Sequence, residues 1–305
     1  MQVQIHYPLF NHDRYDLFGM AHFFDTTPPE FIHQVQTNVR SALAEDVGSG
    51  DLTASLVPAD QQATAKVITR DAAVICGKPW AQEVMRQAAP NSQLDWTVEE
   101  GAQCSAGQTI FTLKGPAKEL LTVERTILNF VQMMSAVATK TAVFTEAVKG
   151  TRASIVDTRK TLPGLRVAQK YAVAAGGGTN HRMGLHDAIL IKENHIAAAG
   201  GIAAVMRSAQ ASSALAKFIE IEVETLAQLQ EALDCGAKMV LLDNMDIPTL
   251  EQAVRINAER AILEISGGVD LNTVRALALT GVDRISVGAL TKDVKAVDLS
   301  MRIEH

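Results

Sequence analysis

Residues 218–244, FIEIEVETLAQLQEALDCGAKMVLLDN, contain the unit that decides the fold of this chain. Two short apolar runs with branched residues flank a stretch, Leu226–Leu233, whose pattern is typical of a helix. Buried parallel strands need such continuous apolar runs, and a helical crossover must connect them. The stretch therefore predicts a strand, a helix and a second strand parallel to the first.

The same unit recurs through the second half of the chain. Its apolar runs are ASIVD (153–157), AILIK (188–192), FIEIEVE (218–224), MVLLDN (239–244), AILEIS (261–266) and RISVGA (284–289). The helical stretches between them are 166–174, 203–211, 226–233, 248–257 and 271–279. This alternation predicts an α/β domain, either a barrel or an open doubly wound sheet.

The first half has a different pattern. In TTPPEFIHQVQTNVRSALAEDVG (26–48), apolar residues recur every four positions from Phe31 to Leu43, which predicts a helix capped by Thr27 with Pro28 in its first turn. Residues 64–113 contain short β-rich runs separated by turns, and residues 117–149 are helical in pattern. We expect a leader at 1–26, an N-terminal α+β domain at 27–135 and the α/β domain at 136–305, with the C-terminal end packed back on the N-terminal domain.

Composition limits the classes of protein. The chain has 305 residues, 47% of them hydrophobic, which is enough for a full core without a disulfide or metal. Its net charge of −6 argues against a nucleic-acid partner. No apolar run approaches the length of a membrane span, and the three cysteines are scattered, which suits a reducing cytoplasm. We therefore expect a cytoplasmic protein that contacts neither nucleic acid nor membrane.

Charged side chains follow the predicted strands. Arg159, Lys160, Lys192, Glu222 and Asp243 all stand at the carboxyl ends of apolar runs. Strand-end polarity by itself predicts small turn residues and does not predict these charges. In a parallel α/β barrel such ends share one face, where active sites form. The pattern predicts a site at that face.

The segment from 152 to 192 is basic within an acidic chain, with seven Lys or Arg residues and two acids. It is either a solvated face or an anion pocket. If it is a pocket, Arg159, Lys160, Arg182 and Lys192 form a receptor for a polyanion, because guanidinium groups grip carboxylate or phosphate bidentately. The three glycines at 176–178 lead into His181, which has either a structural or a binding role.

Two glycine-containing loops follow the last two predicted strands. Ser266–Gly268 and Ser286–Gly288 stand where backbone N–H groups and a helix start suit a phosphate group. Glu222 and Asp243 could hold Mg²⁺ or ribose hydroxyls. An acid inside a strand, such as Glu222, is costly unless it has a partner, so it favours a functional role.

At these residues the sequence resembles the quinolinate phosphoribosyltransferase family, the carboxylating nicotinate-nucleotide pyrophosphorylases. The matching stretches are ALAEDVGSGDLT (42–53), ERTILNF (124–130), DTRKTLPGLR (157–166), KYAVAAGGGTNHRMGLHDAILIKENH (170–195), IEVE (221–224), LLDNM (241–245), ISGGV (265–269) and ISVGALT (285–291). The resemblance implies an N-terminal open-faced sandwich followed by an incomplete, roughly six-stranded α/β barrel. It also implies a homodimer with shared active sites, with higher oligomers left open.

The resemblance further implies an activity and residue roles. The phosphoribosyl group of phosphoribosyl pyrophosphate passes to quinolinate with decarboxylation, giving nicotinate mononucleotide, pyrophosphate and CO₂ in NAD biosynthesis. Lys160, Glu222 and Asp243 would be catalytic, and the two acids would bind Mg²⁺ directly or indirectly. The implied substrate-binding set is Arg125 (from the partner subunit), Thr158, Arg159, Lys160, His181, Arg182, Lys192, Glu222, Asp243, Ser266, Gly267, Gly268, Ser286, Val287 and Gly288.

Two alternatives come from other classes. A Schiff-base aldolase could use Lys160 or Lys192 at a strand end, although such a lysine needs surroundings that lower its pKa. A regulator or accessory protein that binds phosphoribosyl pyrophosphate could use the same scaffold. A full clamp for quinolinate would be superfluous in such a protein.

Overall fold

The computed structural model describes residues 26–304, so the leader expected at 1–26 lies outside the described residues except for Thr26. The described chain forms two compact units. The first contains residues 26–142, 161–177 and 293–304, and the second contains residues 143–160 and 178–292. The boundary expected at 135/136 falls inside a single long helix, α3 (Ala117–Val148).

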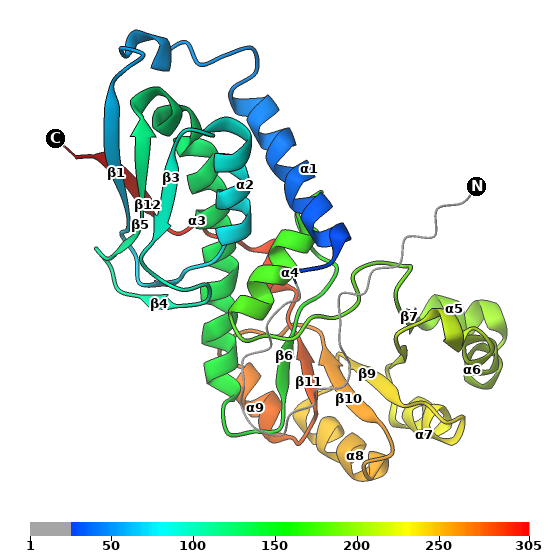
Figure 1. Cartoon of the computed structure of the whole chain (residues 1–305). Helices are drawn as coiled ribbons and strands as arrows, with labels where there is room; N and C mark the ends of the chain where they lie inside the picture. The colour runs from blue at the N-terminus through cyan, green and yellow to red at the C-terminus, as the bar shows by residue number, and fades with distance from the viewer. Residues whose placement is uncertain (1–25, 305) are drawn as a thin grey trace, which may run out of the picture. The chain divides into compact units, whose positions relative to one another are not determined.

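The first unit is built on an antiparallel sheet with the strand order β12-β1-β5-β3 (Figure 1). The strands are β1 (Gln62–Thr69), β3 (Gln93–Trp96), β5 (Thr109–Pro116) and β12 (Leu299–Ile303). The C-terminal strand β12 pairs with β1, Met301 opposite Val67. Two shorter strands, β2 (Ala73–Val74) and β4 (Gln103–Cys104), pair with each other, and a 3₁₀ turn, η1, spans Ala54–Leu56.

Three aromatic rings anchor helices of the first unit. The helices are α1 (Pro29–Asp46), α2 (Lys78–Ala88) and α4 (Arg166–Ala175). Phe31 of α1, Trp80 of α2 and Tyr171 of α4 lie with ring centroids 5.5–5.8 Å apart. Aromatic rings at this spacing add to the stability that burial supplies.

The start of α1 differs from the prediction. The sequence places the cap at Thr27, but the N-cap residue is Pro28 and it has no side-chain cap hydrogen bond. Pro28 is extended, with ψ of 138°, because the residue before a proline is sterically disfavoured in the helical region. Pro29 then occupies the first turn, where its missing N–H costs nothing. The predicted cap was wrong by one residue.

Among residues 26–304, α3 alone is long and apolar enough to cross a membrane by length and composition. Of its most apolar window, 56% is buried inside the protein. A core helix of a globular protein has this character, because it is apolar on several sides. The absence of a membrane contact therefore stays a prediction.

The second unit is a six-stranded parallel sheet with the order β6-β11-β10-β9-β8-β7 (Figure 1). Its strands are β6 (Ser154–Val156), β7 (Ile189–Ile191), β8 (Ile219–Val223), β9 (Met239–Asp243), β10 (Ile262–Ser266) and β11 (Arg284–Ser286). The first strand of the unit pairs with the last, as in a barrel, while β6 and β7 are its two edges. The expected incomplete, six-stranded α/β barrel after an N-terminal α+β domain is confirmed.

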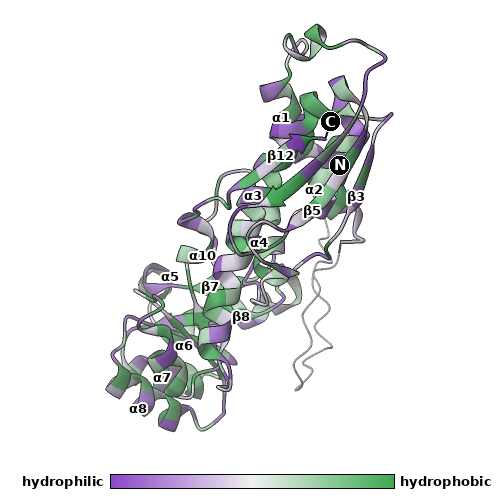
Figure 2. Ribbon diagram, turned by 90° about the vertical axis from the view of Figure 1, so that its left-hand side faces the viewer, coloured by the Kyte–Doolittle hydropathy of each residue, from purple (hydrophilic) through white to green (hydrophobic). Residues whose placement is uncertain are grey.

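Helices connect these strands. They are α5 (Glu193–Ala199), α6 (Ile202–Ala211), α7 (Leu226–Asp234), α8 (Ile247–Asn257), α9 (Val274–Leu279) and α10 (Ala289–Lys292), with a 3₁₀ turn, η2, at Ser213–Leu215. Figure 2 shows both hydrophobic and hydrophilic residues along α8, which buries Leu250 and Ala253. Only α9 starts late against prediction, because the Asp270 carboxylate accepts the Asn272 and Thr273 amides and forms a turn first.

The fold predicts the cost of emptying the centre of this sheet. Leu242 on β9 is 0% exposed, and Leu279 at the end of α9 is 65% exposed. Leu242→Ala should lower the free energy of unfolding by about 2–5 kcal/mol, because it leaves a cavity. The matched Leu279→Ala should change it by less than about 0.5 kcal/mol. Urea denaturation followed by circular dichroism measures both, and equal effects would contradict the assigned core.

Candidate active site

Register and alternation place the polar strand ends on one face of the parallel sheet. Ser266 pairs with Asp243, and Glu222 pairs with Leu241 two residues before Asp243. Because side chains alternate along a strand, residues two apart share a face. The same argument, through the pairs of β11 and β6, places Ser286 on that face. If the alternation is continued past the strand ends, Thr158, Lys192 and Gly288 also lie on this face.

Lys192 and Glu222 form an ion pair at this face. Lys192 Nζ donates to Glu222 Oε2 over 2.6 Å. The Lys192 side chain is 44% exposed and that of Glu222 is 10% exposed. The partner that the sequence required for an acid inside a strand is therefore Lys192. The exposed lysine can also reach a ligand above the sheet.

Two further cations of the predicted site, Arg159 and Arg182, lie near enough to affect each other electrostatically. Arg182 is buried, and its Nη1 donates to the Ala188 carbonyl oxygen over 3.3 Å. Burial and the neighbouring Arg159 lower the pKa of Arg182, while Asp187 and Glu220 act in the opposite direction. Like charges at such a position disfavour each other, so a bound anion would stabilise both. This electrostatic arrangement favours an anion pocket over a solvated face.

The first and last strands of the unit bring Thr158, Lys160 and Gly288 together. The Lys160 amide donates to Thr158 Oγ1 over 3.1 Å, and Thr291 Oγ1 donates to the Lys160 carbonyl over 2.7 Å. A Cβ on Gly288 would lie 3.2 Å from Lys160 Cδ. Gly288 therefore lets the lysine side chain lie against the loop after β11.

The loop after β10 has a backbone conformation with positive φ, which glycine adopts more readily than other residues. Gly267 and Gly268 have φ values of +105° and +59°. A Cβ on Gly267 would overlap the side chain of Asn244, whose own amide donates to the Ser266 carbonyl over 3.1 Å. Asn244 Nδ2 also donates to Asp243 Oδ2 over 2.9 Å. The loop after β9 and the loop after β10 therefore hold each other in position.

The loop after β11 differs from the expected row of bare N–H groups. The Val287 amide donates to the Val156 carbonyl over 2.8 Å, and its side chain is 1% exposed. The Ser286 hydroxyl donates to the buried Glu264 carboxylate. Ser286 and Gly288 therefore share the site face, but the hydroxyl of Ser286 and the amide of Val287 are already bonded within the protein.

His181 is turned into the interior of the sheet. Its Nδ1 accepts the Arg182 amide over 2.7 Å, and its Nε2 lies 2.7 Å from Glu220 Oε2. The backbone amide of His181 donates to Asp157 Oδ1 over 2.8 Å. Both ring nitrogens are therefore engaged by the protein, which favours the structural role that the sequence left open.

Three charged residues beneath the site were missed by sequence reasoning. Glu220 and Glu264 are 0% exposed, and Arg284 Nε donates to Glu264 Oε2 over 2.7 Å. Burial and the neighbouring Glu264 raise the pKa of Glu220 to about 6, against the opposing effects of His181 and Arg284. The signal was present in the sequence, since both acids interrupt apolar runs in the same way as Glu222.

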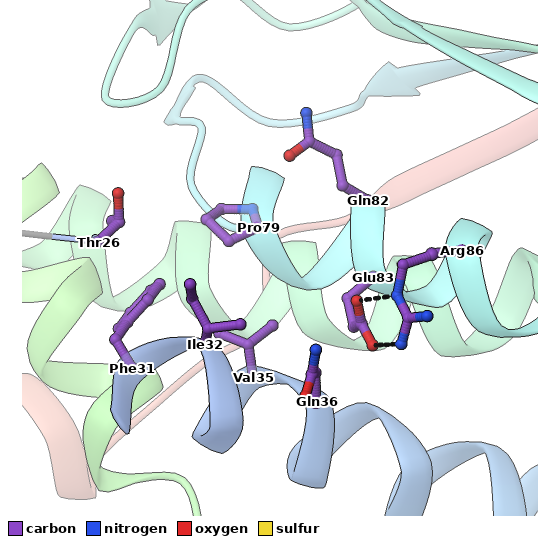
Figure 3. Close-up of a pocket in the computed structure, with 9 residues that line it drawn as sticks. All are labelled: Thr26, Phe31, Ile32, Val35, Gln36, Pro79, Gln82, Glu83 and Arg86. Atoms are coloured by element: carbon purple, nitrogen blue, oxygen red, sulfur yellow. Dashed lines mark hydrogen bonds and ion pairs between the residues drawn. The ribbon is translucent and has the colours of Figure 1, made fainter. Parts of the chain in front are cut away.

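Arg125 and the groove between α1 and α2 both belong to the first unit, whereas the strand-end residues belong to the second unit. Arg125 lies exposed on α3 in the first unit. A groove between α1 and α2 of that unit is lined by Phe31, Ile32 and Val35 and contains no predicted site residue (Figure 3). Its charged residues, Glu83 and Arg86, bind each other over 2.6 Å. Nothing in this groove matches the chemistry at the strand ends.

Comparison with known proteins covers most of the chain. The quinolinate phosphoribosyl transferase N-terminal domain matches residues 51–135, and the C-terminal domain of the same family matches residues 137–302. The nicotinate-nucleotide pyrophosphorylase [carboxylating] of Mycobacterium leprae (strain TN) is 42% identical over 270 residues, which are 86% of this chain and 95% of that protein.

A plant protein and a solved structure agree. The quinolinate phosphoribosyltransferase [decarboxylating] 1b of Nicotiana tabacum is 36% identical over 286 residues, covering 87% of this chain and 81% of that protein. The structure of the nicotinate-nucleotide pyrophosphorylase from Francisella tularensis superposes with a TM-score of 0.87 and 45% identity. It covers 90% of this chain and 97% of that one.

The buried acid predicts a pH-dependent stability. Glu220 faces His181, Glu264, Arg284 and the more distant Arg182. Because its pKa rises from 4.5 to about 6 on folding, its stabilising contribution is complete below 4.5 and is lost as pH rises through about 6. Glu220→Gln does not titrate, so its melting temperature relative to wild type should rise between about pH 5 and pH 7.5. The exposed Glu251→Gln serves as control, and a constant difference for Glu220→Gln would contradict the assignment.

Proposed function

This chain belongs to the quinolinate phosphoribosyltransferase family, and we propose that the cations at the carboxyl ends of its parallel strands hold quinolinate. The enzyme transfers the phosphoribosyl group of phosphoribosyl pyrophosphate to quinolinate with decarboxylation, giving nicotinate mononucleotide, pyrophosphate and CO₂ in NAD biosynthesis. The observations that carry the site assignment are the electrostatic effect of Arg159 on the buried Arg182 and the Lys192–Glu222 ion pair at the strand ends.

The two carboxylates of quinolinate suit these three cations. Arg159 and Arg182 can each grip a carboxylate bidentately, and a dianion relieves the mutual repulsion that lowers the pKa of Arg182. Lys192 reaches the same face from β7 and is already held in position by Glu222. His181 supports this clamp from below, because its ring nitrogens contact the Arg182 amide and Glu220.

Phosphoribosyl pyrophosphate would occupy the neighbouring strand ends. Thr158 and Lys160 lie against Gly288, and the loop Ser266–Gly268 begins one strand away. A positive side chain next to glycine backbone suits phosphate oxygens. We assign the 5′-phosphate to the two glycine loops and the pyrophosphate to Lys160. Because Ser286 and Val287 bond internally, Gly288 is the residue of the second loop that stands nearest the ligand.

Mg²⁺ fits the donors present. Glu222 and Asp243 project from neighbouring strands on one face, and carboxylate oxygens are the ligands that Mg²⁺ prefers. We propose that these two acids hold the ion, directly or through water. When bound, Mg²⁺ would offset the negative charge of the departing pyrophosphate.

Different residues assist different steps of the proposed reaction. Lys160 stabilises the pyrophosphate as it leaves C1 of the ribose, where positive charge develops. The arginine clamp holds the ring nitrogen of quinolinate toward that carbon, which lowers the entropic cost of the attack. The pyridinium formed in this step draws electrons from the adjacent carboxylate as CO₂ leaves. The proposal requires no side-chain nucleophile.

Assembly and location are part of the proposal. The family resemblance places Arg125 in the pocket of a second subunit, and its exposed position on α3 is compatible with contact to another chain. We therefore propose a homodimer with shared sites. The scattered cysteines support a cytoplasmic location.

The alternatives have less support. A Schiff-base lysine must lose its proton, whereas Lys192 is held by the Glu222 carboxylate, which favours the charged ammonium form. A regulator that binds phosphoribosyl pyrophosphate alone would not need Arg159 and Arg182 side by side. Homologues over nearly the whole chain are enzymes by name.

Substrate choice tests the clamp. Quinolinate should give nicotinate mononucleotide in the presence of phosphoribosyl pyrophosphate and Mg²⁺, while nicotinate should react at least about a hundred times more slowly. The reason is that a monocarboxylate leaves part of a cationic clamp unpaired. Product formation followed by chromatography measures both rates. Comparable kcat/KM values for the two acids would remove the basis for the clamp.

Subunit mixing tests the shared site. Arg125→Ala and Lys160→Ala should each be inactive alone, since each leaves a substrate anion without its partner. After mixing and reassembly about half the dimers are mixed, and one of the two pockets in each is intact, so about a quarter of wild-type activity should return. Light scattering and mass-tagged subunits confirm exchange. Exchange without recovered activity would show that Arg125 acts within its own chain or not at all.

A further inference from the structure

Beneath the proposed quinolinate clamp lies a chain of buried hydrogen bonds that starts at Glu220. Glu220 Oε2 lies 2.7 Å from His181 Nε2, and His181 Nδ1 accepts the Arg182 amide over 2.7 Å. A backbone amide can only donate, so Nδ1 carries no proton. The proton of the ring is therefore on Nε2, which donates it to Glu220. The carboxylate selects the tautomer that can receive Arg182.

The same chain of bonds reaches both arginines. The amide of His181 donates to Asp157 Oδ1 over 2.8 Å, and Asp157 stands two residues before Arg159. Arg182 is adjacent to His181, and its guanidinium is held by the Ala188 carbonyl. His181 thus links the backbone segments that carry Arg159 and Arg182. Its orientation in turn depends on Glu220.

The buried position of Glu220 is unfavourable for the free energy of the fold. It is 0% exposed, and its Oε1 has no hydrogen-bond partner among the described residues. An unsatisfied buried carboxylate oxygen lowers the stability of a fold. A residue kept at such a cost is better explained by what it positions than by stability.

A metal ion is a weaker explanation of the cluster. One ligand atom from each of His181, Glu220 and Glu264 lies within 4.8 Å of the others. However, Glu264 already accepts from Arg284 and from the Ser286 hydroxyl. The distance from His181 to Glu220 is that of a hydrogen bond, and Arg284 supplies the positive charge that a cation would bring.

We propose that Glu220 is a positioning residue of the quinolinate clamp: by accepting the Nε2 proton of His181, it holds the tautomer that fixes the backbone of Arg182. This role rests on the proposed binding of quinolinate by Arg159 and Arg182. It assigns Glu220 no contact with either substrate, so phosphoribosyl pyrophosphate binding does not depend on it.

The test is a pair of substitutions with opposite hydrogen-bonding capacity. Glu220→Leu removes the acceptor, so it should raise the KM for quinolinate by about tenfold or more, the loss expected for a misplaced charged hydrogen bond. The KM for phosphoribosyl pyrophosphate should stay within about twofold. The melting temperature should fall, because the buried Nε2–H of His181 loses its acceptor, so both KM values are measured well below it. Glu220→Gln keeps an acceptor oxygen, so its quinolinate KM should stay within about twofold of wild type.

Met239→Leu, a buried volume-conserving change on neighbouring β9, is the matched control and should leave both KM values unchanged. An unchanged quinolinate KM in stable Glu220→Leu overturns the positioning role while the function stands. Wild-type protein that does not use quinolinate overturns the function itself.

A second measurement does not depend on how the variants fold. Nitrogen-15 NMR of labelled wild-type protein should show His181 with Nε2 protonated and Nδ1 unprotonated. The opposite tautomer would overturn the proposal, because Nδ1 could not then accept the Arg182 amide.

Discussion

Parallel pairing of β8, β9 and β10 holds Glu222, Asp243 and Ser266 on one face of the sheet, because side chains alternate along each strand. A shift of one residue in any strand would turn its functional side chain into the opposite layer. The apolar residues between them, such as Leu242 and Ile265, are buried on the other face and maintain that register. The alternation along each strand therefore places the apolar residues on one face of the sheet and the polar strand-end residues on the other.

Electrostatics separates the sheet into two levels. Lysine and acid side chains meet at the carboxyl ends, as in the Lys192–Glu222 ion pair, while burial and Arg159 lower the pKa of Arg182. Anionic groups lie inside, where burial and Glu264 raise the pKa of Glu220. Two like-charged pairs, Arg159 with Arg182 and Glu220 with Glu264, are unfavourable for stability by themselves. The proposed dianionic substrate would offset the repulsion between Arg159 and Arg182.

The sequence predicted most of the fold because its signals were local. The runs that became β6 to β11 and the helix α7 follow from apolar patterning alone. The need of Glu222 for a partner followed from its place in a strand, and Lys192 is that partner. Tertiary contacts could not be predicted in this way. His181 was left open because its role depends on Glu220, 39 residues away, and the hydroxyl of Ser286 is taken by Glu264 from the next strand. The late start of α9 and the cap of α1 reflect turn and proline geometry that patterning does not resolve. The role proposed for Arg125 involves a second subunit, which no pattern within one chain can reveal.

The central claim is that Arg159, Arg182 and Lys192 together hold the two carboxylates of quinolinate. A crystal structure of the protein with quinolinate measures this most directly. The account predicts one carboxylate in contact with the paired guanidinium groups, the second within reach of Lys192, and His181 beneath them with its bond to Glu220 intact. Quinolinate bound at the glycine loops, or held without contact to either arginine, would contradict it.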